Sequence, residues 1–320
     1  MITVLLDGEG GVSFADKADP VPGRGEALVR VLQAGICSTD IELKNGYMNF
    51  RGTPGHEFVG RVEACDERPE LIGQRVVSEI NISCRECDLC KREMERHCVS
   101  RSVIGILEQP GAFSELLTLP YRNLHVVPET ISDDRAVFVE PVAAAFEILE
   151  QVEILLGDSV LVIGDGRLGS LCARVLHQTG AQVSVLGKHE RKLEPLRNDG
   201  IETFDRKSRS EKSFDIVIEA SGSPEGLEKA LWWVRPRGTV VLKTTCSKQH
   251  EISLASLVVD EITLIGSRCG PFAPAIAALE KGDLAPEETI DERFPLVKVE
   301  AAFKRAEEAG IRKVILEMPR

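Results

Sequence analysis

The sequence has few aromatic residues, no excess of basic charge and no long hydrophobic run. Aromatic residues make up 5% of the 320 residues, and the excess of acidic over basic side chains gives a net charge of −12. A protein that neutralises nucleic-acid phosphates needs the opposite balance, so we expect no nucleic-acid partner. No segment approaches about 18 uninterrupted apolar residues, and no basic stretch precedes an apolar one near the start, so we expect a cytoplasmic protein without a membrane partner.

Cysteine, in contrast, is plentiful, with nine in the chain. A reducing compartment disfavours disulfides, so clustered cysteines are interpreted first as metal ligands. The length suits two domains, since domains usually have about 100–200 residues.

The sequence pattern changes along the chain and indicates two domains. Residues 1–141 carry short alternating stretches punctuated by Gly and Pro, which predict a β-rich domain of small strands. Over residues 142–270 strands and helices alternate, which is typical of an α/β doubly wound parallel sheet. The predicted elements include a helix from Val142 to Glu153, the strand Gln182–Leu186 and the helix Glu190–Asn198. Residues 271–320 contain an amphipathic helix, Val299–Ala309, and a terminal strand, too little to fold alone, so we expect them to join the first domain.

Four cysteines form the most specific motif. Cys84, Cys87, Cys90 and Cys98 have the spacing C-x2-C-x2-C-x7-C, which lets one loop surround a tetrahedral zinc with four thiolates at about 2.3 Å. The segment is rich in Arg, Glu and Lys, so it is no buried core. Closed coordination by four thiolates favours a structural metal over a redox pair.

A second, mixed set of metal-binding residues is spread over the first domain. Cys37 is followed by His56 and Glu57 in Pro54-Gly-His-Glu-Phe, and Glu140 stands at the expected domain boundary. Each alone is more often an ordinary packing residue. Thiolate, imidazole and carboxylate together are the ligands of a zinc that keeps one position open for water or substrate.

A glycine motif lies between a predicted strand and a predicted helix. The glycines permit a tight turn and let backbone N–H groups approach a pyrophosphate at the start of the helix. In this context the motif predicts dinucleotide binding. Its residues are Gly164, Gly166, Arg167, Leu168 and Gly169.

The end of the next strand bears on the identity of the dinucleotide. Sites that prefer NAD place Asp or Glu there to bind the adenosine ribose hydroxyls. Here Gly187 leaves room for a phosphate, and Lys188, His189 and Arg191 supply positive charge, so we predict that NADP is preferred over NAD. The alternative is that these basic residues are simply solvated at the start of a helix.

With these motifs the chain resembles the zinc-containing medium-chain alcohol dehydrogenase family, which includes sorbitol, threonine and glucose dehydrogenases. The resemblance implies a GroES-like catalytic domain and a Rossmann domain, with two zinc ions per chain. It implies that Cys37 and His56 bind the catalytic zinc, with Glu57 or Glu140 as a further ligand. The matching segments are Cys37–Asp40, Gly55–Glu57, the four-cysteine motif, Gly111–Glu115, Glu140–Pro141 and the glycine motif.

The same resemblance suggests roles for residues around the metal. Asp40 would orient His56, and Thr39 would pass the substrate proton outward. Many relatives end this relay at a histidine where this chain has Glu42. There are two alternatives for the exit of the proton: Glu42 replaces the histidine, or Glu42 simply faces solvent. Arg268 roughly matches a position near cofactor and substrate in sorbitol-type relatives. Apart from the resemblance, residues 45–50 lie between the two metal motifs and are candidates for lining the pocket; the alternative is that Tyr47 and Phe50 are ordinary packing residues.

The expected reaction is hydride transfer between an alcohol, polyol or sugar and NADP, with NAD as the second choice. Zinc would act as Lewis acid on the substrate oxygen. The expected assembly is a homodimer or homotetramer, as in relatives. Two alternatives are kept: a zinc-free quinone or enoyl reductase of the same fold, and a non-catalytic zinc- and nucleotide-binding redox sensor.

Overall fold

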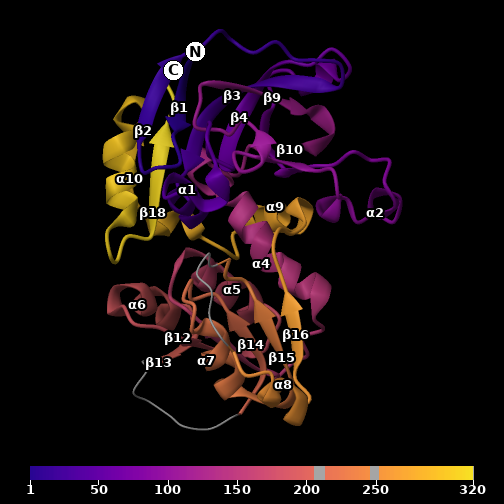
Figure 1. Cartoon of the computed structure of the whole chain (residues 1–320), viewed down its shortest axis with the longest axis vertical. Helices are drawn as coiled ribbons and strands as arrows, with labels where there is room; N and C mark the ends of the chain where they lie inside the picture. The colour runs from indigo at the N-terminus through magenta and orange to yellow at the C-terminus, as the bar shows by residue number, and fades with distance from the viewer. Residues whose placement is uncertain (205–212, 246–251, 320) are drawn as a thin grey trace. The chain divides into compact units, whose positions relative to one another are not determined.

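The computed structural model describes residues 1–204, 213–245 and 252–319 (Figure 1). The chain divides into two compact units, residues 1–140 with 272–320 and residues 141–271. Within the described residues, no helix is both long and apolar enough to cross a membrane.

The first unit is built mostly from antiparallel strands. They are β1 (Ile2–Leu6), β2 (Val12–Asp16), β3 (Glu26–Gly35), β4 (Glu57–Ala64), β5 (Arg75–Ser78), β6 (Asn81–Ile82), β7 (Ser102–Ile104), β8 (Glu108–Gln109), β9 (Leu116–Pro120), β10 (Leu124–Val126), β17 (Ile290–Pro295) and β18 (Lys313–Glu317). The main sheet has the order β10-β5-β4-β3-β18-β17, with β9 paired to β3. Side chains of β3 alternate between buried and half-buried over most of its length, as a strand with one face on a core requires.

Short helices complete this unit. The α-helices are α1 (Ser38–Lys44), α2 (Asp88–Lys91), α3 (Asp133–Ala136), α9 (Phe272–Lys281) and α10 (Val299–Glu307). The 3-10 turns are η1 (Tyr47–Asn49), η2 (Pro69–Leu71), η3 (Glu95–His97), η4 (Tyr121–Asn123), η5 (Pro286–Thr289) and η6 (Leu296–Lys298). The strand β18 pairs antiparallel with β3, so the end of the chain completes the sheet formed by its beginning.

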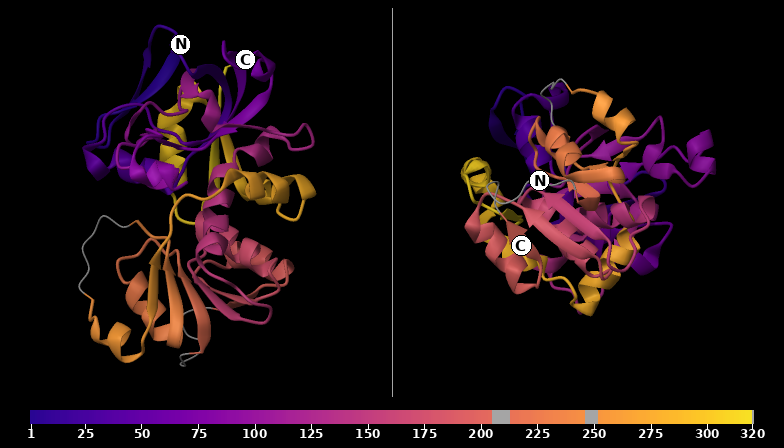
Figure 2. Two further views of the ribbon diagram at one scale, coloured as in Figure 1. Left: turned by 90° about the vertical axis from the view of Figure 1, so that its right-hand side faces the viewer. Right: turned by 90° about the horizontal axis from the view of Figure 1, so that it is seen from below.

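The second unit contains a parallel sheet with helices on both faces (Figure 2). Its strands are β11 (Ser159–Ile163), β12 (Gln182–Leu186), β13 (Glu202–Phe204), β14 (Phe214–Glu219), β15 (Val234–Leu242) and β16 (Thr263–Gly266). Its helices are α5 (Arg167–His177), α6 (Glu190–Asn198), α7 (Gly226–Trp233) and α8 (Ala255–Val259), and α4 (Val139–Gln151) begins in the first unit. In the order β13-β12-β11-β14-β15-β16 the strands that follow β11 in the chain are first added on one side of it and then, from β14, on the other. Doubly wound folds bind nucleotides at the ends of the strands where this change occurs.

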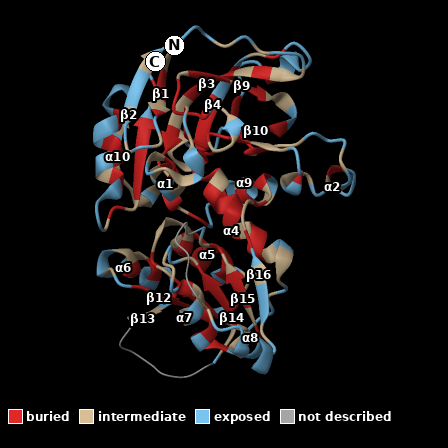
Figure 3. Cartoon of the chain, in the orientation of Figure 1, coloured by how far each residue is buried: buried red, intermediate tan, exposed pale blue. Residues whose placement is uncertain are grey.

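The core of the second unit lies between this sheet and its helices. The residues of β11 after Ser159 are all buried, as expected for a parallel strand covered on both faces. The last four residues of the neighbouring β14 are buried as well (Figure 3). Trp233 of α7 packs edge-on against Phe204 and Phe214, with ring centroids 5.7 and 6.1 Å apart. The predicted combination of a β-rich domain and a doubly wound parallel sheet is confirmed.

Candidate active site

Cys37 lies where β3 gives way to α1. It is the residue before the first turn of α1, and its backbone N–H donates to Asp40 Oδ2 at 2.8 Å. The other carboxylate oxygen of Asp40 accepts from the N–H of Gly55 at 3.1 Å. Asp40 is fully buried. One carboxylate therefore joins the segment that carries Cys37 to the segment that carries His56.

The segment before His56 is held by close backbone contacts. Gly55 has a φ of +100°, and a Cβ there would lie 2.3 Å from the ring of the buried Phe113. The N–H groups of Ala112 and Phe113 donate to the carbonyls of Gly55 and Pro54. Only glycine meets both the left-handed backbone and the close approach, so Gly55 fixes the direction in which His56 projects.

The structure brings Cys37, His56 and Glu57 together. Each offers a ligand atom, and these three atoms lie within 4.8 Å of one another. His56 and Glu57 are buried. Among the described residues, Glu140 is not part of this group; it lies in the first turn of α4 and is the last residue of the first unit before the boundary at Pro141.

The electrostatics of the group suit a cation. Burial raises the pKa of the Cys37 thiol, but the hydrogen bond and charge of His56 outweigh it, so the pKa is lowered overall. Burial likewise opposes charge on His56, yet the carboxylate of Asp40 and the sulfur of Cys37 raise its pKa well above the ordinary range. His56 Nδ1 lies 3.5 Å from Asp40 Oδ1. The lowered thiol pKa of Cys37 and the carboxylate of Asp40 beside His56 favour positive charge at this point, which a metal bound by thiolate and imidazole would supply in place of the imidazole proton.

A buried lysine that no sequence pattern predicted contacts this group. Lys313, the first residue of β18, is 1% exposed, and its ammonium pairs with Glu57 Oε2. The ammonium also lies 5.4 Å from the ring centroid of Phe138. Gly35 makes room for it, because a Cβ on Gly35 would lie 2.5 Å from Lys313 Cε. Burial lowers the pKa of Lys313 to about 8.

Thr39, the predicted proton-transfer residue, and Glu42, one alternative for the exit of the proton, both lie on α1. The hydroxyl of Thr39 is 3.8 Å from the Cys37 sulfur, and Thr39 is half-buried. Glu42 is exposed. Thr39 therefore lies beside the group, while Glu42 faces solvent one turn later.

The four-cysteine lobe has the dimensions of a zinc site. The sulfur of Cys98 lies 3.4 Å from that of Cys84, and the sulfur of Cys87 lies 3.5 Å from Cys90 and 3.8 Å from Cys98. A tetrahedron with Zn–S bonds of about 2.3 Å has edges of about 3.8 Å, so the spacing fits, whereas a disulfide needs about 2.05 Å. A hydrogen bond from the backbone of Cys90 is the main reason that the pKa of Cys87 falls to about 6.

The glycine motif has the predicted form at the end of β11. Gly164 has a φ of +120°, and a Cβ there would lie 2.5 Å from the carbonyl of Ala220. A Cβ on Gly169 would lie 2.1 Å from the carbonyl of Gly164, so the helix can pack this closely only with glycine. A Cβ on Gly166 would meet nothing within 4 Å. The open space at Gly166, just before α5, is where a pyrophosphate would approach the backbone.

The basic residues predicted to bind the cofactor follow β12. Gly187 is buried, while Lys188 and Arg191 are exposed and His189 is partly exposed. Arg167 and Leu168, in the first turn of α5, are half-buried. Arg268 is half-buried after β16, and its carbonyl accepts from the buried ammonium of Lys243 at 2.9 Å.

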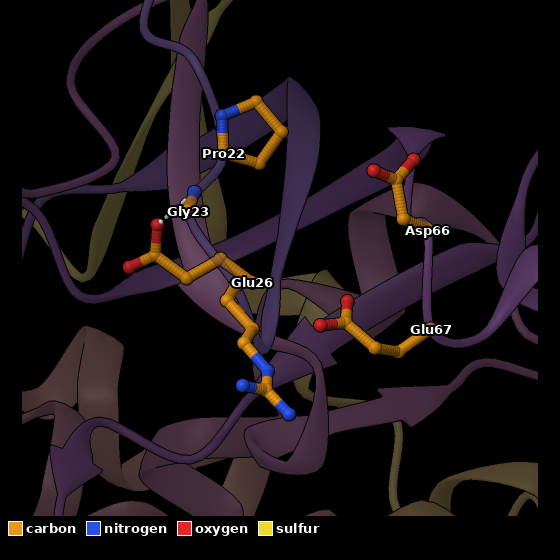
Figure 4. Close-up of a pocket in the computed structure, with 6 residues that line it drawn as sticks. Pro22, Gly23, Glu26, Asp66 and Glu67 are labelled. Carbon is orange, nitrogen blue, oxygen red and sulfur yellow. Dashed lines mark hydrogen bonds between the residues drawn. The ribbon is translucent and has the colours of Figure 1, made fainter.

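A hollow of about 340 Å³ lies elsewhere in the first unit (Figure 4). Its lining includes Glu26 and Glu67, whose carboxylates accept from the backbone N–H groups of Gly23 and Gly25. None of the predicted site residues lines it.

Comparison with known families gives two matches along the chain. Residues 23–129 match the alcohol dehydrogenase GroES-like domain, and residues 168–281 match the zinc-binding dehydrogenase domain. Together they cover more than half of the chain. The first match contains the Cys37 group and the four-cysteine lobe, and the second begins within the glycine motif.

Individual proteins are similar over nearly the whole length. The chain is 28% identical to L-galactonate-5-dehydrogenase of Escherichia coli over 89% of each chain. It is 28% identical to D-arabitol-phosphate dehydrogenase of Enterococcus avium, covering 96% of this chain and 94% of that protein.

Two solved structures, each 26% identical in sequence, share the fold. One is an alcohol dehydrogenase from Escherichia coli complexed with NADH, with a TM-score of 0.91 and 99% of both chains covered. The other is a zinc-binding dehydrogenase from Sinorhizobium meliloti bound to NADP, with a TM-score of 0.89, covering 99% of this chain and 98% of that one.

Proposed function

Because the chain belongs to the medium-chain dehydrogenase family, we propose that Cys37, His56 and Glu57 hold its catalytic zinc and that NADP is its preferred cofactor. The reaction class expected from the sequence is confirmed: the protein is a zinc-type, NAD(P)-dependent oxidoreductase of alcohols or polyols. The proposal concerns the residues and the cofactor that carry out this reaction. Its main support is the gathering of three chemically different ligand atoms within 4.8 Å.

The chain supplies the groups that a catalytic zinc needs. Zinc held with one position open polarises a substrate oxygen and lowers the pKa of the alcohol. Cys37 and His56 provide two ligands, and a carboxylate oxygen of Glu57 lies within 4.8 Å of both ligand atoms, which favours Glu57 over Glu140 as the third. Asp40 holds the two ligand segments together and orients His56, a support that metal-bound imidazoles commonly have.

Thr39 is the residue that we assign to proton transfer. Its hydroxyl can donate one proton while accepting another, and it lies 3.8 Å from the Cys37 sulfur. The hydroxyl therefore takes the substrate proton and passes it outward. Glu42 is exposed one turn later on α1, where its carboxylate exchanges protons with water.

The lobe of Cys84, Cys87, Cys90 and Cys98 is proposed to hold a second, structural zinc. The spacing of its sulfur atoms supports closed tetrahedral coordination. Elemental analysis of the purified protein should give two zinc ions per chain. A Cys98→Ser variant should retain one, and a wild-type value of one would contradict the assignment.

The preference for NADP rests on the residues after β12. Gly187 carries no acidic side chain for the ribose hydroxyls, and the exposed Lys188 and Arg191 can neutralise a 2′-phosphate. Exchanging both basic residues for alanine should raise the KM for NADP at least about tenfold and leave that for NAD within about twofold. Lys229→Ala, which removes a cation from α7, is the control. Equal effects on both cofactors would refute the preference.

The substrate is proposed to be a polyol or sugar, because the named relatives act on a sugar acid and on a sugar-alcohol phosphate. Incubating the protein with NADP and a panel of polyols, sugars and secondary alcohols, while following the absorbance of reduced cofactor, tests this. Turnover of several polyols supports it. A protein with both zinc ions that reduces no cofactor with any substrate would favour the non-catalytic redox sensor. We propose a homodimer or homotetramer, to be measured by sedimentation equilibrium.

A further inference from the structure

The residue between the first two glycines of the nucleotide motif makes contacts that the proposed mechanism does not use. Asp165 Oδ2 accepts from the backbone N–H groups of Lys188 and His189 at 2.7 and 2.6 Å. His189 Nδ1 lies 3.0 Å from the same oxygen and 3.1 Å from Oδ1. The side chain of Asp165 is 9% exposed. The glycine loop after β11 is therefore tied to the turn after β12 through one buried carboxylate.

The same carboxylate fills the space beside Gly187. A Cβ on Gly187 would lie 2.9 Å from Asp165 Cβ and 3.0 Å from Asp165 Oδ2. It would also lie 2.6 Å from Cδ2 of the buried Leu193, so the end of that side chain must shift as well. Asp165 Cβ belongs to the glycine loop and cannot move without displacing the loop. Asp165 is therefore the obstacle at position 187 that cannot be relieved by turning the end of a side chain.

This matters because position 187 ends the second strand, where NAD-type sites place their acidic residue. We propose that Asp165 and Gly187 act as one specificity-determining unit, in which Asp165 anchors the 187–189 turn and excludes the acidic side chain that would select NAD. This inference rests on the proposed dinucleotide function of the loop. It adds that cofactor choice depends on two positions that are distant in sequence.

The consequence is that the two positions are not independent. Gly187→Asp alone would place a Cβ against Asp165 and a second carboxylate beside the first, and two close carboxylates resist joint ionisation. Asp165→Gly removes both obstacles. The carboxylate at 187 could then accept from the N–H groups of Lys188 and His189 and face the ribose.

The test measures dissociation constants of NADH and NADPH from the fluorescence of the reduced cofactor on binding, which needs neither substrate nor turnover. The proteins are the wild type, Gly187→Asp, Asp165→Gly and the double variant. Gly187→Ala, alone and with Asp165→Gly, separates steric from charge effects. Gly266→Asp is the control for stability, since it adds an aspartate at the end of β16, where a Cβ meets nothing within 4 Å.

We expect Gly187→Asp to weaken binding of both cofactors at least about tenfold, through steric conflict and like-charge repulsion. The double variant should bind NADH within about threefold of the wild type, with the NADH/NADPH preference moved at least about tenfold toward NADH. Gly187→Ala should weaken both cofactors, and Asp165→Gly should relieve that loss. A melting temperature restored in the double variant supports the same coupling if Gly187→Asp folds poorly.

Two results would overturn the inference. Gly187→Asp that binds NADH as tightly as the double variant would show that Asp165 excludes nothing. The positions would also be shown to be independent if the effects of Asp165→Gly on cofactor binding were additive both with those of Gly187→Asp and with those of Gly187→Ala. A wild type that binds neither cofactor would instead remove the proposed nucleotide function itself, so the two failures are distinguishable.

Discussion

Replacing Lys313 with methionine tests how much the stability of the protein depends on the buried ion pair between Lys313 and Glu57. Lys313 is 1% and Glu57 2% exposed. Removing one partner of a buried pair leaves the other charge uncompensated, which costs about 3–5 kcal/mol. The ammonium's contact with the Phe138 ring is lost as well. For a unit of this size such a loss lowers the melting temperature by about 6–20 °C.

The assay is thermal unfolding of the zinc-free protein, because a metal could compensate Glu57. Lys281→Met is the control: Lys281 also pairs with a carboxylate, that of Asp283, but is 76% exposed, so its loss should cost less than about 1 kcal/mol. Lys313→Met with Glu57→Gln removes both charges and should recover most of the loss. Zinc affinity, measured by competition with a chelating dye, should rise in Lys313→Met because a cation beside the ligands is gone.

The reasoning is refuted if Lys313→Met in the zinc-free protein melts within about 2 °C of the wild type. The reasoning is also refuted if adding Glu57→Gln to Lys313→Met lowers the free energy of unfolding further, by as much as Glu57→Gln does alone.

Three further perturbations follow from the structure. Gly55→Ala should destabilise the protein by more than about 2 kcal/mol and lower its zinc content, since the new Cβ would lie 2.3 Å from the Phe113 ring; unchanged zinc and melting would contradict this. Removing zinc with a chelator should open the segment around Cys98 to proteolysis before the rest of the chain, since the lobe has little apolar core of its own. Burial raises the pKa of Asp215, but hydrogen bonds from Ser159 and from the guanidinium of Arg235 outweigh burial and lower the pKa to about 2. Asp215→Asn should therefore lower the free energy of unfolding by about 1 kcal/mol at pH 7, after allowance for solvent screening. That difference should persist above about pH 4 and shrink as the pH falls toward 2, measured by urea unfolding.

Local patterns were sufficient for the strongly periodic elements. Two predicted elements have the predicted bounds in the structure, the strand Gln182–Leu186 and the helix Glu190–Asn198. Both are specified by patterns within neighbouring residues, a short strand-forming run followed by an amphipathic helical pattern. Helix α4 begins at Val139, earlier than the predicted start at Val142, and so includes Glu140. The three-residue strand β13 has too few residues for a periodic signal.

The parts of the site that were missed depend on contacts between distant segments. Lys313 opens an ordinary apolar strand, and a lysine there is expected to be exposed. Its burial follows from the pairing of β18 with β3, which places it beside Gly35 and Glu57. Asp165 occupies the variable position of the glycine motif, and its contacts with the β12 turn arise only when β11 and β12 pair. No spacing rule along the chain encodes either contact.

The central proposal, that Cys37, His56 and Glu57 hold a catalytic zinc, is tested most directly by His56→Asn. Its zinc content, its affinity for reduced cofactor and its rate of cofactor reduction with an active polyol are measured on the same sample. We predict one zinc ion per chain instead of two, unchanged cofactor affinity, and a rate lowered at least about a thousandfold. A variant that contains a single zinc ion and still turns over at the wild-type rate would contradict the proposal.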